Sequence, residues 1–381
     1  SQAINIIKQN ENKNNSIFFE SYMLLIIDSL KKGDLNKASN YLLSARKIAK
    51  QDQFNSAILE TLKQYIFVFR EKKIPDNKKN FGNLSIISET FQRCYLEDPE
   101  TEAYFSNMIN NKEGDFSRYI YFYLGYLIEN NRIKDAKKIT DSIKFINANL
   151  LLSQGKNWIE TDNANRLKEV FSCKNYNDVV SEFLFLISNL YSSQDNFKKS
   201  NFYLNISYFL NPKFIFNLSL VAENQINNLE YKKARNTLKK FKKDIEFYYW
   251  YRLKKEAQII SKKRNKKESL NYITSNFSEI ENPNIKILFD IANFHKNAKN
   301  YKEAIKYYTR IINKVEDGSK IKSDLFYRRG GSYERIGNYE QADKDMLNSL
   351  EIDPEDAYVL NYLAYSWLER DYKIEEAMDM L

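Results

Sequence analysis

The chain has 381 residues, with 59 Lys and Arg against 50 Asp and Glu, and its formal net charge is +9. Apolar residues make up 43% of it, so we expect a folded protein, and the presence of only 9 Gly and 5 Pro disfavours an all-β fold with many turns. A single His and two distant Cys argue against a zinc site, and no apolar run approaches the ~18 residues of a membrane span.

The N-terminal part of the chain predicts helices joined by short connections. Phe19–Asp52 shows two apolar stripes at helical spacing around a Gly-Asp turn, and Gln53–Glu71 shows one long stripe. Lys72–Asn83 combines Pro, Gly, Asn and Lys and is the best loop candidate. Helices are again expected over Leu84–Leu96 and Glu100–Ile109, where the apolar spacing fits a repeat template poorly.

A regular repeat begins at residue 181. Each repeat consists of two short amphipathic helices joined by a tight turn, and successive starts are separated by 34, 35, 35 and 38 residues. A run of tandem matches in near-constant register indicates an array in which each unit buries its apolar face by stacking on its neighbours. The five starts are Ser181, Ile215, Trp250, Ile285 and Ser323, and Ala357 begins a last unit.

Ser323–Pro354 is the best-formed of these units. Its first helix places Phe326, Gly330 and Tyr333 on one face, where a small residue lets the second helix approach closely. Gly337 supplies the positive φ that a helix exit needs, and the closing Pro lacks the amide hydrogen that would continue the second helix. This unit and its register predict an all-α fold.

The unit resembles the tetratricopeptide repeat (TPR), a helix–turn–helix of 34 residues. In addition, the run FYRRGGSYERIGNYEQADKDMLNSLEIDPEDAYVLNYLAYSWLERDYKIEEAMDML at Phe326–Leu381 resembles a family of alphaproteobacterial TPR proteins, although Ala364 stands where that family usually has Gly. The resemblance covers about residues 115–381. It implies a right-handed superhelical solenoid, a scaffold or adaptor role facing the periplasm or the outer membrane, and no known catalytic residues.

We divide the chain accordingly into degenerate N-terminal helical repeats over 1–114, divergent TPR-like repeats over 115–180, and a regular TPR array over 181–381. The chain starts at Ser1 without a methionine and stops at Leu381 within an apolar helical stripe. We therefore expect it to be a fragment of a longer protein, and an export signal could have preceded Ser1.

Catalysis is not expected from this sequence, and neither a metal nor another cofactor is. Cys94 and Cys173 lie outside any metal-binding spacing; a disulfide is possible, but two buried free thiols are the favoured interpretation, and the compartment cannot be read from them. The only histidine, His295, falls on the core-facing side of its helix and is interpreted as a packing residue.

The inner surface of the array is the first candidate for a binding site. In TPR arrays the first helix of each unit lines this surface, beside its core stripe. Aromatic and amide side chains interleave there and could grip an extended peptide, whereas the alternative is a solvated face in a protein of an AT-rich genome. The expected partner-binding residues are Phe185, Asn189, Phe216, Glu223, Tyr251, Lys254, Gln258, Lys286, Phe289, Asn293, Tyr327, Arg328, Tyr358, Asn361 and Tyr365.

A local concentration of positive charge is the second candidate. Residues 232–267 contain fifteen Lys or Arg and three acids, a net charge of +12, so the rest of the chain sums to −3. Such a patch favours an acidic protein face or anionic phospholipid headgroups, while nucleic acid is less favoured because no RNA-binding motif accompanies it. The patch residues are Lys239, Lys240, Lys242, Lys243, Lys262, Lys263, Arg264, Lys266 and Lys267.

Three functional hypotheses follow. The first is a non-enzymatic scaffold, associated with the cell envelope, that binds a protein or peptide in its concave groove. The second is a cytoplasmic adaptor or nucleic-acid-associated protein that uses the basic patch. The third is an accessory part of a larger enzyme or assembly.

Overall fold

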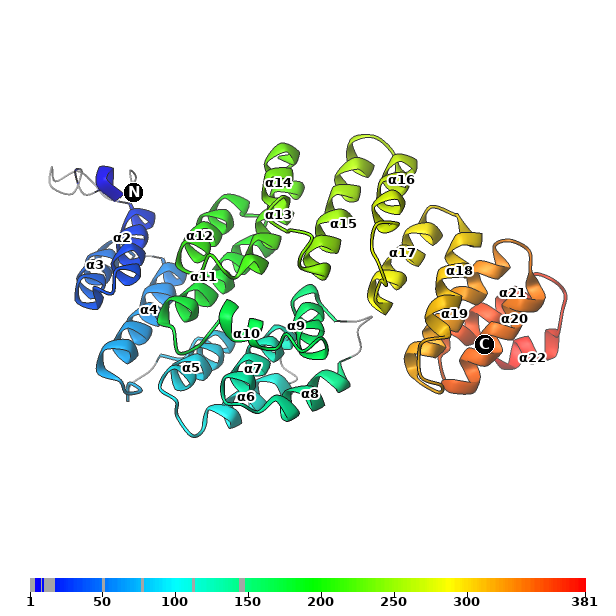
Figure 1. Cartoon of the computed structure of the whole chain (residues 1–381), viewed down its shortest axis with the longest axis horizontal. Helices are drawn as coiled ribbons and strands as arrows, with labels where there is room; N and C mark the ends of the chain where they lie inside the picture. The colour runs from blue at the N-terminus through cyan, green and yellow to red at the C-terminus, as the bar shows by residue number, and fades with distance from the viewer. Residues whose placement is uncertain are drawn as a thin grey trace. The chain divides into compact units, whose positions relative to one another are not determined.

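The computed structural model describes residues 4–7, 9, 18–49, 52–76, 79–111, 114–143 and 148–381. Every regular element within these residues is a helix, as expected for an all-α chain (Figure 1). The chain forms two compact units: unit 1 comprises Ser1–Ser142 and Asn149–Tyr248, and unit 2 comprises Ile143–Ala148 and Tyr249–Leu381. The division after Tyr248 falls inside a helix and does not coincide with the expected boundaries at 114 and 180.

Unit 1 contains most of the helices. They are α2 (Phe19–Lys31), α3 (Leu35–Ile48), α4 (Gln53–Glu71), α5 (Asn83–Tyr95), α6 (Thr101–Asn110), α7 (Ser117–Glu129), α8 (Ile133–Ser142), α9 (Leu150–Glu160), α10 (Asn165–Val170), α11 (Tyr176–Ser193), α12 (Phe197–Leu210), the 3-10 helix η2 (Ile215–Asn217), α13 (Leu218–Asn227) and α14 (Tyr231–Leu238). The predicted long helix and the loop that follows it are thus confirmed, except that residues 77–78 lie outside the described part.

Unit 2 is a succession of helix pairs. Its helices are α15 (Glu246–Lys263), whose first turn belongs to unit 1, α16 (Lys266–Phe277), α17 (Ile285–Asn297), α18 (Tyr301–Ile312), α19 (Lys320–Glu334), α20 (Tyr339–Ile352), α21 (Ala357–Leu368) and α22 (Ile374–Asp379). The pairs α17–α18 and α19–α20 are the repeats predicted from Ile285 and Ser323.

Short polar side chains determine where many helices begin. Ser319 accepts a hydrogen bond from the Lys322 amide, so α19 starts at Lys320, three residues before the predicted start of its unit. Asn175 likewise caps α11, which begins five residues before Ser181. Spacing of apolar residues therefore identified the repeat correctly but placed these helix starts late, because the cap lies outside the apolar stripe.

Unit 1 closes on itself through contacts between segments far apart in the sequence. Lys31 Nζ donates a 2.7 Å hydrogen bond to the carbonyl oxygen of Leu210, 179 residues later, and Tyr176 donates to the carbonyl oxygen of Leu30 at 3.2 Å. Helix α12 packs against α2, and α11 packs against α4 and α5. These contacts lie beyond the nearest-neighbour stacking of a simple repeat array.

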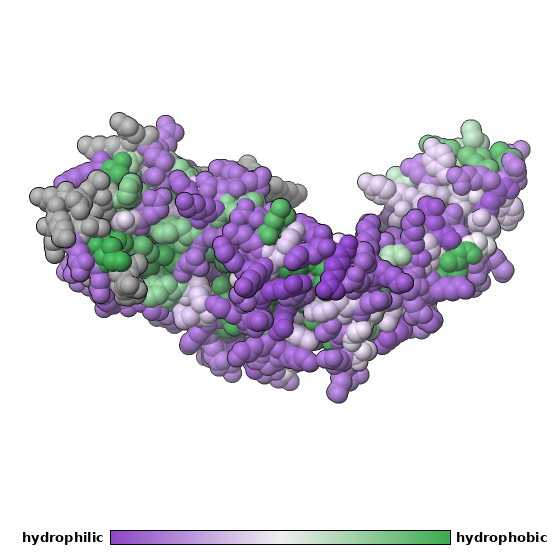
Figure 2. Space-filling view, turned by 90° about the horizontal axis from the view of Figure 1, so that it is seen from above, coloured by the Kyte–Doolittle hydropathy of each residue, from purple (hydrophilic) through white to green (hydrophobic). Residues whose placement is uncertain are grey.

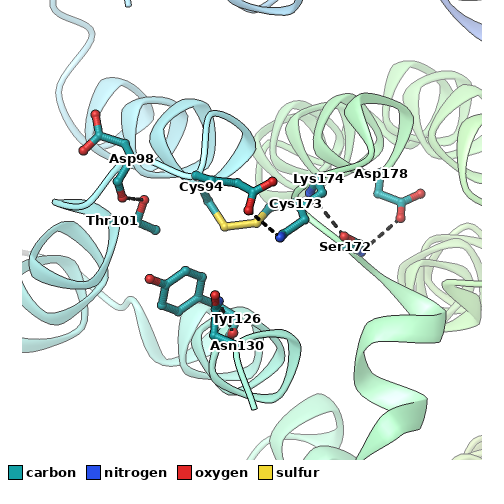
Figure 3. Close-up of a disulfide and its surroundings, with 10 residues drawn as sticks. Cys94, Asp98, Thr101, Tyr126, Asn130, Ser172, Cys173, Lys174 and Asp178 are labelled. Carbon is teal, nitrogen blue, oxygen red and sulfur yellow. Dashed lines mark hydrogen bonds and ion pairs between the residues drawn. A yellow bond between two sulfur atoms is a disulfide. The ribbon is translucent and has the colours of Figure 1, made fainter. Parts of the chain in front are cut away.

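Cys94 and Cys173 form a disulfide, with their Cα atoms 5.8 Å apart. It links the last turn of α5 to the connection between α10 and α11 (Figure 3). The expectation of two free thiols was wrong, because the return of α11 against α5 brings together cysteines that are 79 residues apart. On one side of the disulfide, the Lys174 ammonium lies 2.7 Å from the carboxylate of Glu97.

The packing of unit 2 follows the predicted stripes. A buried cluster runs from Trp250 through α16, α17 and α18 to Leu325, and a second one surrounds Trp367. His295 is buried and stacks on the Tyr307 ring at 5.5 Å between centroids, so its interpretation as a packing residue is confirmed. Tyr333, by contrast, is only half-buried.

Close contact between α19 and α20 explains two further residues. A Cβ at Gly330 would lie 3.1 Å from the Ala342 carbonyl oxygen, as expected for a small residue between packed helices. Next to it, Arg329 makes two 2.7 Å hydrogen bonds to the buried Asp345 carboxylate. An ion pair therefore occupies the helix interface where an apolar contact would be usual.

Two further classes of feature are absent from the described residues. None of their helices is both long and apolar enough to cross a membrane. In the same part of the chain, no group of three or more His, Cys, Asp or Glu side chains could hold a metal ion.

Candidate functional site

The predicted binding stripe does not remain open in unit 1. Arg118, from α7, lies 3.8 Å from the centroid of the Phe185 ring and 4.9 Å from that of Phe216. It also donates two 2.7 Å hydrogen bonds to Glu182, which is fully buried, and one to Asn217 at 3.1 Å. Phe185 is therefore a buried residue whose ring packs against the Arg118 guanidinium. This corrects the prediction that it lies on a partner-binding surface.

The remaining stripe residues of unit 1 are spread over separate helices. Asn189 is exposed on α11 and Glu223 is half-buried on α13. Burial raises the pKa of Glu182 despite the Arg118 guanidinium beside it. The arrangement at Arg118 is thus a buried, internally paired cluster, and it leaves unit 2 as the better place for a partner.

Unit 2 contains a hollow of about 870 Å³ between α15, α16 and α17, which we name the lysine hollow. It combines three stripe residues with two residues of the basic patch, and none of its lining residues is acidic. The lining residues are Tyr251, Lys254, Lys255, Gln258, Ser261, Lys262, Lys266, Ser269, Leu270, Phe294, Asn297 and Ala298. The predicted stripe did not include residues of α16, because only the first helix of each repeat was expected to line the inner surface.

Asp290 holds the ammonium group of Lys254, one of the cations that line the lysine hollow. Asp290 Oδ2 lies 2.7 Å from Lys254 Nζ and accepts a 2.8 Å hydrogen bond from the Trp250 indole. Lys286, on the same helix as Asp290, has a lowered pKa because of burial, and the positive charge of Lys254 lowers it further. Lys262 and Lys266 are exposed at the rim, and neither makes an ion pair within the described residues.

A second, smaller hollow of about 250 Å³ adjoins the first, since Asn297 lines both. We name it the tyrosine hollow; it is lined by Lys296, Asn297, Tyr301, Tyr327, Arg328, Gly331, Arg335 and Tyr362. The Tyr327 and Tyr362 rings meet edge to face with centroids 5.7 Å apart. The pKa of Lys296 is lowered by burial and by the like charge of Arg328.

Other predicted residues of unit 2 lie beside these hollows rather than in them. Phe289 is buried, with the Arg328 guanidinium 5.1 Å from its ring centroid, and Asn293 accepts a 2.7 Å hydrogen bond from Tyr308. The three predicted residues of α21 are exposed and line neither hollow; they are Tyr358, Asn361 and Tyr365.

The basic patch divides between the two units. Lys239, Lys240, Lys242 and Lys243 are exposed at the end of α14 and after it, in unit 1, where Lys240 lies 4.5 Å from the Tyr208 ring centroid. The other five, at 262–264 and 266–267, surround the α15–α16 turn in unit 2. The space-filling view shows a largely hydrophilic face with hydrophobic residues in separate areas (Figure 2).

Comparison with known proteins identifies the repeats of unit 2. A family model described as tetratricopeptide repeat matches residues 285–313 and 323–356. The helix pairs α17–α18 and α19–α20 are tetratricopeptide repeats. The chain is 38% identical over 80 residues to a TPR repeat-containing protein of Methanocaldococcus jannaschii, an alignment that covers 21% of this chain and 13% of that protein.

Two solved TPR-related structures are similar in part. The Cut9–Hcn1 hetero-tetramer of the APC/C is 14% identical with a TM-score of 0.37, covering 92% of this chain and 71% of that one. The TPR domain of P58(IPK) is 12% identical with a TM-score of 0.24, covering 95% and 91%. Scores at this level carry no conclusion about function.

Both hollows lie in unit 2, between its successive helix pairs. The lysine hollow separates α15 from α17, and the tyrosine hollow lies along α17, α19 and α21. The arrangement presents cations, amides and aromatic rings together, which is suited to binding.

Proposed function

We propose that this TPR protein is an interaction scaffold of the cell envelope, and that unit 2 binds an acidic segment of a partner protein in the lysine hollow. Tetratricopeptide repeats are protein-interaction modules in general, which supports the scaffold role. The acidic partner and the location are inferences from this chain.

The absence of acidic residues from the lysine-hollow lining carries the proposal. Lys254, Lys255, Lys262 and Lys266 line one hollow of about 870 Å³. The charge of Lys254 is balanced by Asp290, whereas Lys262 and Lys266 at the rim make no ion pair within the described residues. Clustered like charges favour a ligand of opposite sign, because it relieves their repulsion and speeds association.

Neutral groups of the hollow favour a peptide over a simple ion. Tyr251 and Phe294 supply aromatic surface, and Gln258 and Asn297 supply amides that can pair with a peptide main chain. The adjoining tyrosine hollow continues this pattern with Tyr327 and three further cations. A segment in extended conformation would contact both.

The disulfide supports a location outside the reducing cytoplasm. Disulfides form and persist mainly in oxidising compartments such as the bacterial periplasm. Cys94 and Cys173 are the only cysteines of the chain, and both take part in the bond. Together with the resemblance to exported alphaproteobacterial proteins, this favours the envelope hypothesis over the cytoplasmic one.

The binding proposal is tested with a fluorescent, end-capped glutamate-rich peptide and its glutamine counterpart. Wild-type protein should bind the glutamate peptide preferentially, and the double variant Lys262→Glu/Lys266→Glu should weaken binding at least about tenfold. Fluorescence anisotropy at several salt concentrations provides the measurement, because affinity between exposed charges falls as salt rises.

A matched control separates the hollow from net charge. Lys239→Glu/Lys242→Glu makes the same change in charge at exposed residues of unit 1 that line neither hollow. It should bind the glutamate peptide nearly as wild type does. Equal losses in the two double variants, or no preference of wild type for the glutamate peptide, would contradict the proposal.

Thiol trapping of the native protein in its own cells would test the compartment: a reduced cysteine pair there would contradict export.

A further inference from the structure

A third hollow, of about 510 Å³, lies in unit 1 between α4, α5 and α6. It is distinct in composition from the two hollows of unit 2, because amide side chains dominate its walls. Gln64, Asn80, Asn107 and Asn111 all line it, and they come from α4, from α6 with its C-cap, and from the loop before α5. We name it the amide hollow.

Gln64 is the most unusual of these residues. Its side chain on α4 is only 9% exposed, and its amide nitrogen has no hydrogen-bond partner. A buried amide without a partner is costly to fold, so its presence at a hollow needs an explanation. A ligand that enters the hollow and accepts a hydrogen bond from this amide provides one.

The walls of the amide hollow are held in position by contacts outside it. Arg93 lies 3.1 Å from Glu89 and places its guanidinium 4.2 Å from the Tyr104 ring centroid. Asp98 and Glu100 hold the same guanidinium from the other side, at 2.9 and 2.8 Å. Glu89 and Tyr104 both line the hollow, so Arg93 fixes two of its walls before any ligand arrives.

Hydrogen bonds to nearby backbone amides also fix the side chains that line the hollow from the loop before α5 and from its first turn. The Asn80 side-chain oxygen accepts a 2.8 Å hydrogen bond from the Gly82 amide, which directs the Asn80 nitrogen elsewhere as a donor. Ser85 accepts a 2.8 Å hydrogen bond from the Phe81 amide. Both side chains therefore keep defined directions at the hollow.

The spacing of the polar groups matches an extended polypeptide. Ser85 and Glu89 are four residues apart on α5, and Asn107 and Asn111 have the same separation along α6 and its C-cap. Four residues advance a helix by ~6 Å. Alternate residues of an extended chain are separated by ~6.6 Å, so two rows at this spacing can pair with alternate peptide units of one strand.

The charge of its lining residues distinguishes the amide hollow from the lysine hollow of unit 2. The hollow is lined by one cation, Lys79, and one anion, Glu89, and Arg93 already pairs with the latter. We propose that the amide hollow binds an uncharged, extended segment of a partner protein through its main chain, at a site independent of the lysine hollow.

The test uses a library of capped, extended dodecapeptides without Asp, Glu, Lys or Arg, selected on the full chain. Selected peptides should bind wild type with little salt dependence and should lose at least about tenfold in affinity for Gln64→Leu and for Asn107→Ala. N-methylation of the peptide bonds, one at a time, should weaken binding at alternate positions only, because a main chain paired along one edge offers every second amide.

Gln92→Leu is the matched control. Gln92 is also buried on α5, with neither its amide nitrogen nor its oxygen paired, but it does not line the hollow. Both Gln→Leu variants should unfold at the same or a higher midpoint than wild type, and only Gln64→Leu should lose peptide.

Several outcomes would overturn this site: no peptide enriched on wild type, binding that survives Gln64→Leu, or no effect of N-methylation. Capture of a neutral oligosaccharide such as maltohexaose in place of peptides would assign the hollow to a glycan instead. The Lys262→Glu/Lys266→Glu variant should keep full affinity for the uncharged peptides, so failure of this inference is separable from failure of the acidic-partner proposal.

Discussion

The hydroxyl oxygens of Ser323 and Ser349 lie 2.9 Å apart, and each hydroxyl donates a hydrogen bond to the backbone carbonyl of the other residue. Ser181 and Ser207 repeat this arrangement in unit 1, again with a separation of 26 residues. The pair joins the start of the first helix of a repeat to the end of the second. Two copies, one in each unit, indicate a recurrent way of closing a helix pair at short range.

The serine pair should be energetically coupled. Ser323→Ala and Ser349→Ala should each lower the free energy of unfolding by about 1 kcal/mol, because each leaves a buried carbonyl with one partner fewer. The double variant should cost less than the sum of the two. Urea denaturation of the four proteins measures the coupling, and strictly additive losses would show that the two hydroxyls act independently.

The adjacent glycines of α19 should respond differently to the same substitution. Gly331→Ala should stabilise the protein by about 0.5–1 kcal/mol, since helical Gly is unfavourable and the nearest atom to an added Cβ is the Tyr362 hydroxyl at 3.6 Å. Gly330→Ala should be less stable than Gly331→Ala, because its Cβ meets the Ala342 carbonyl at 3.1 Å. Thermal unfolding of the two variants provides the comparison; a reversed order would contradict the close helix approach.

Removal of the disulfide should destabilise unit 1. The chain-entropy relation assigns about 4–5 kcal/mol to a cross-link that closes a loop of this length, 79 residues. Cys94→Ser/Cys173→Ser should therefore lower the free energy of unfolding and speed hydrogen exchange in α5 and α11. Exchange in α19 and α20 of unit 2 should stay unchanged, and equal effects in both units would refute a local role.

The Arg118–Glu182 pair should tolerate joint removal better than loss of one partner. Glu182 is fully buried, so Arg118→Met alone would leave its charge without compensation and should cost about 3–5 kcal/mol. Arg118→Met/Glu182→Leu should recover a large part of that loss, because the surrounding Phe185 and Phe216 rings can pack against apolar side chains. Chemical denaturation of both variants tests this order.

Asp178 should make unit 1 less stable at neutral than at acid pH. Burial raises its pKa to about 6 from the ordinary 3.8, although it accepts a hydrogen bond from the Ser172 amide. Between these two values the folded chain holds a proton that the unfolded chain has released, so stability falls as pH rises from 3.8 to about 6. The difference between wild type and Asp178→Asn should change by about 2–3 kcal/mol over this window. A difference independent of pH would show that the carboxyl ionises normally.

The sequence predicted local structure far better than long-range structure. Helical spacing found α4 to the residue and the α17–α18 and α19–α20 repeats, because these depend on neighbours within about one repeat. Helical spacing did not predict the disulfide or the packing of Arg118 against Phe185. Both depend on contacts between segments that are 64 or more residues apart in the sequence. The lysine hollow brings together three residues of the predicted stripe and two of the predicted basic patch, but its other lining residues depend on the packing of α16 against α15 and α17 and could not be read from spacing.

The closure of unit 1 has a consequence for synthesis. Helix α2 buries a face that includes Met23, Leu25 and Ile26, and it needs α12 beside it. Lys31 and Leu210 are 179 residues apart, so at ribosomal rates of about 5–20 residues per second α2 waits roughly 10–40 s for its partner. The helices α17 to α22 of unit 2 pack against their neighbours along the chain and have no comparable delay. An emerging chain thus exposes its first helices longest, and this interval is the one in which a chaperone would have most to protect.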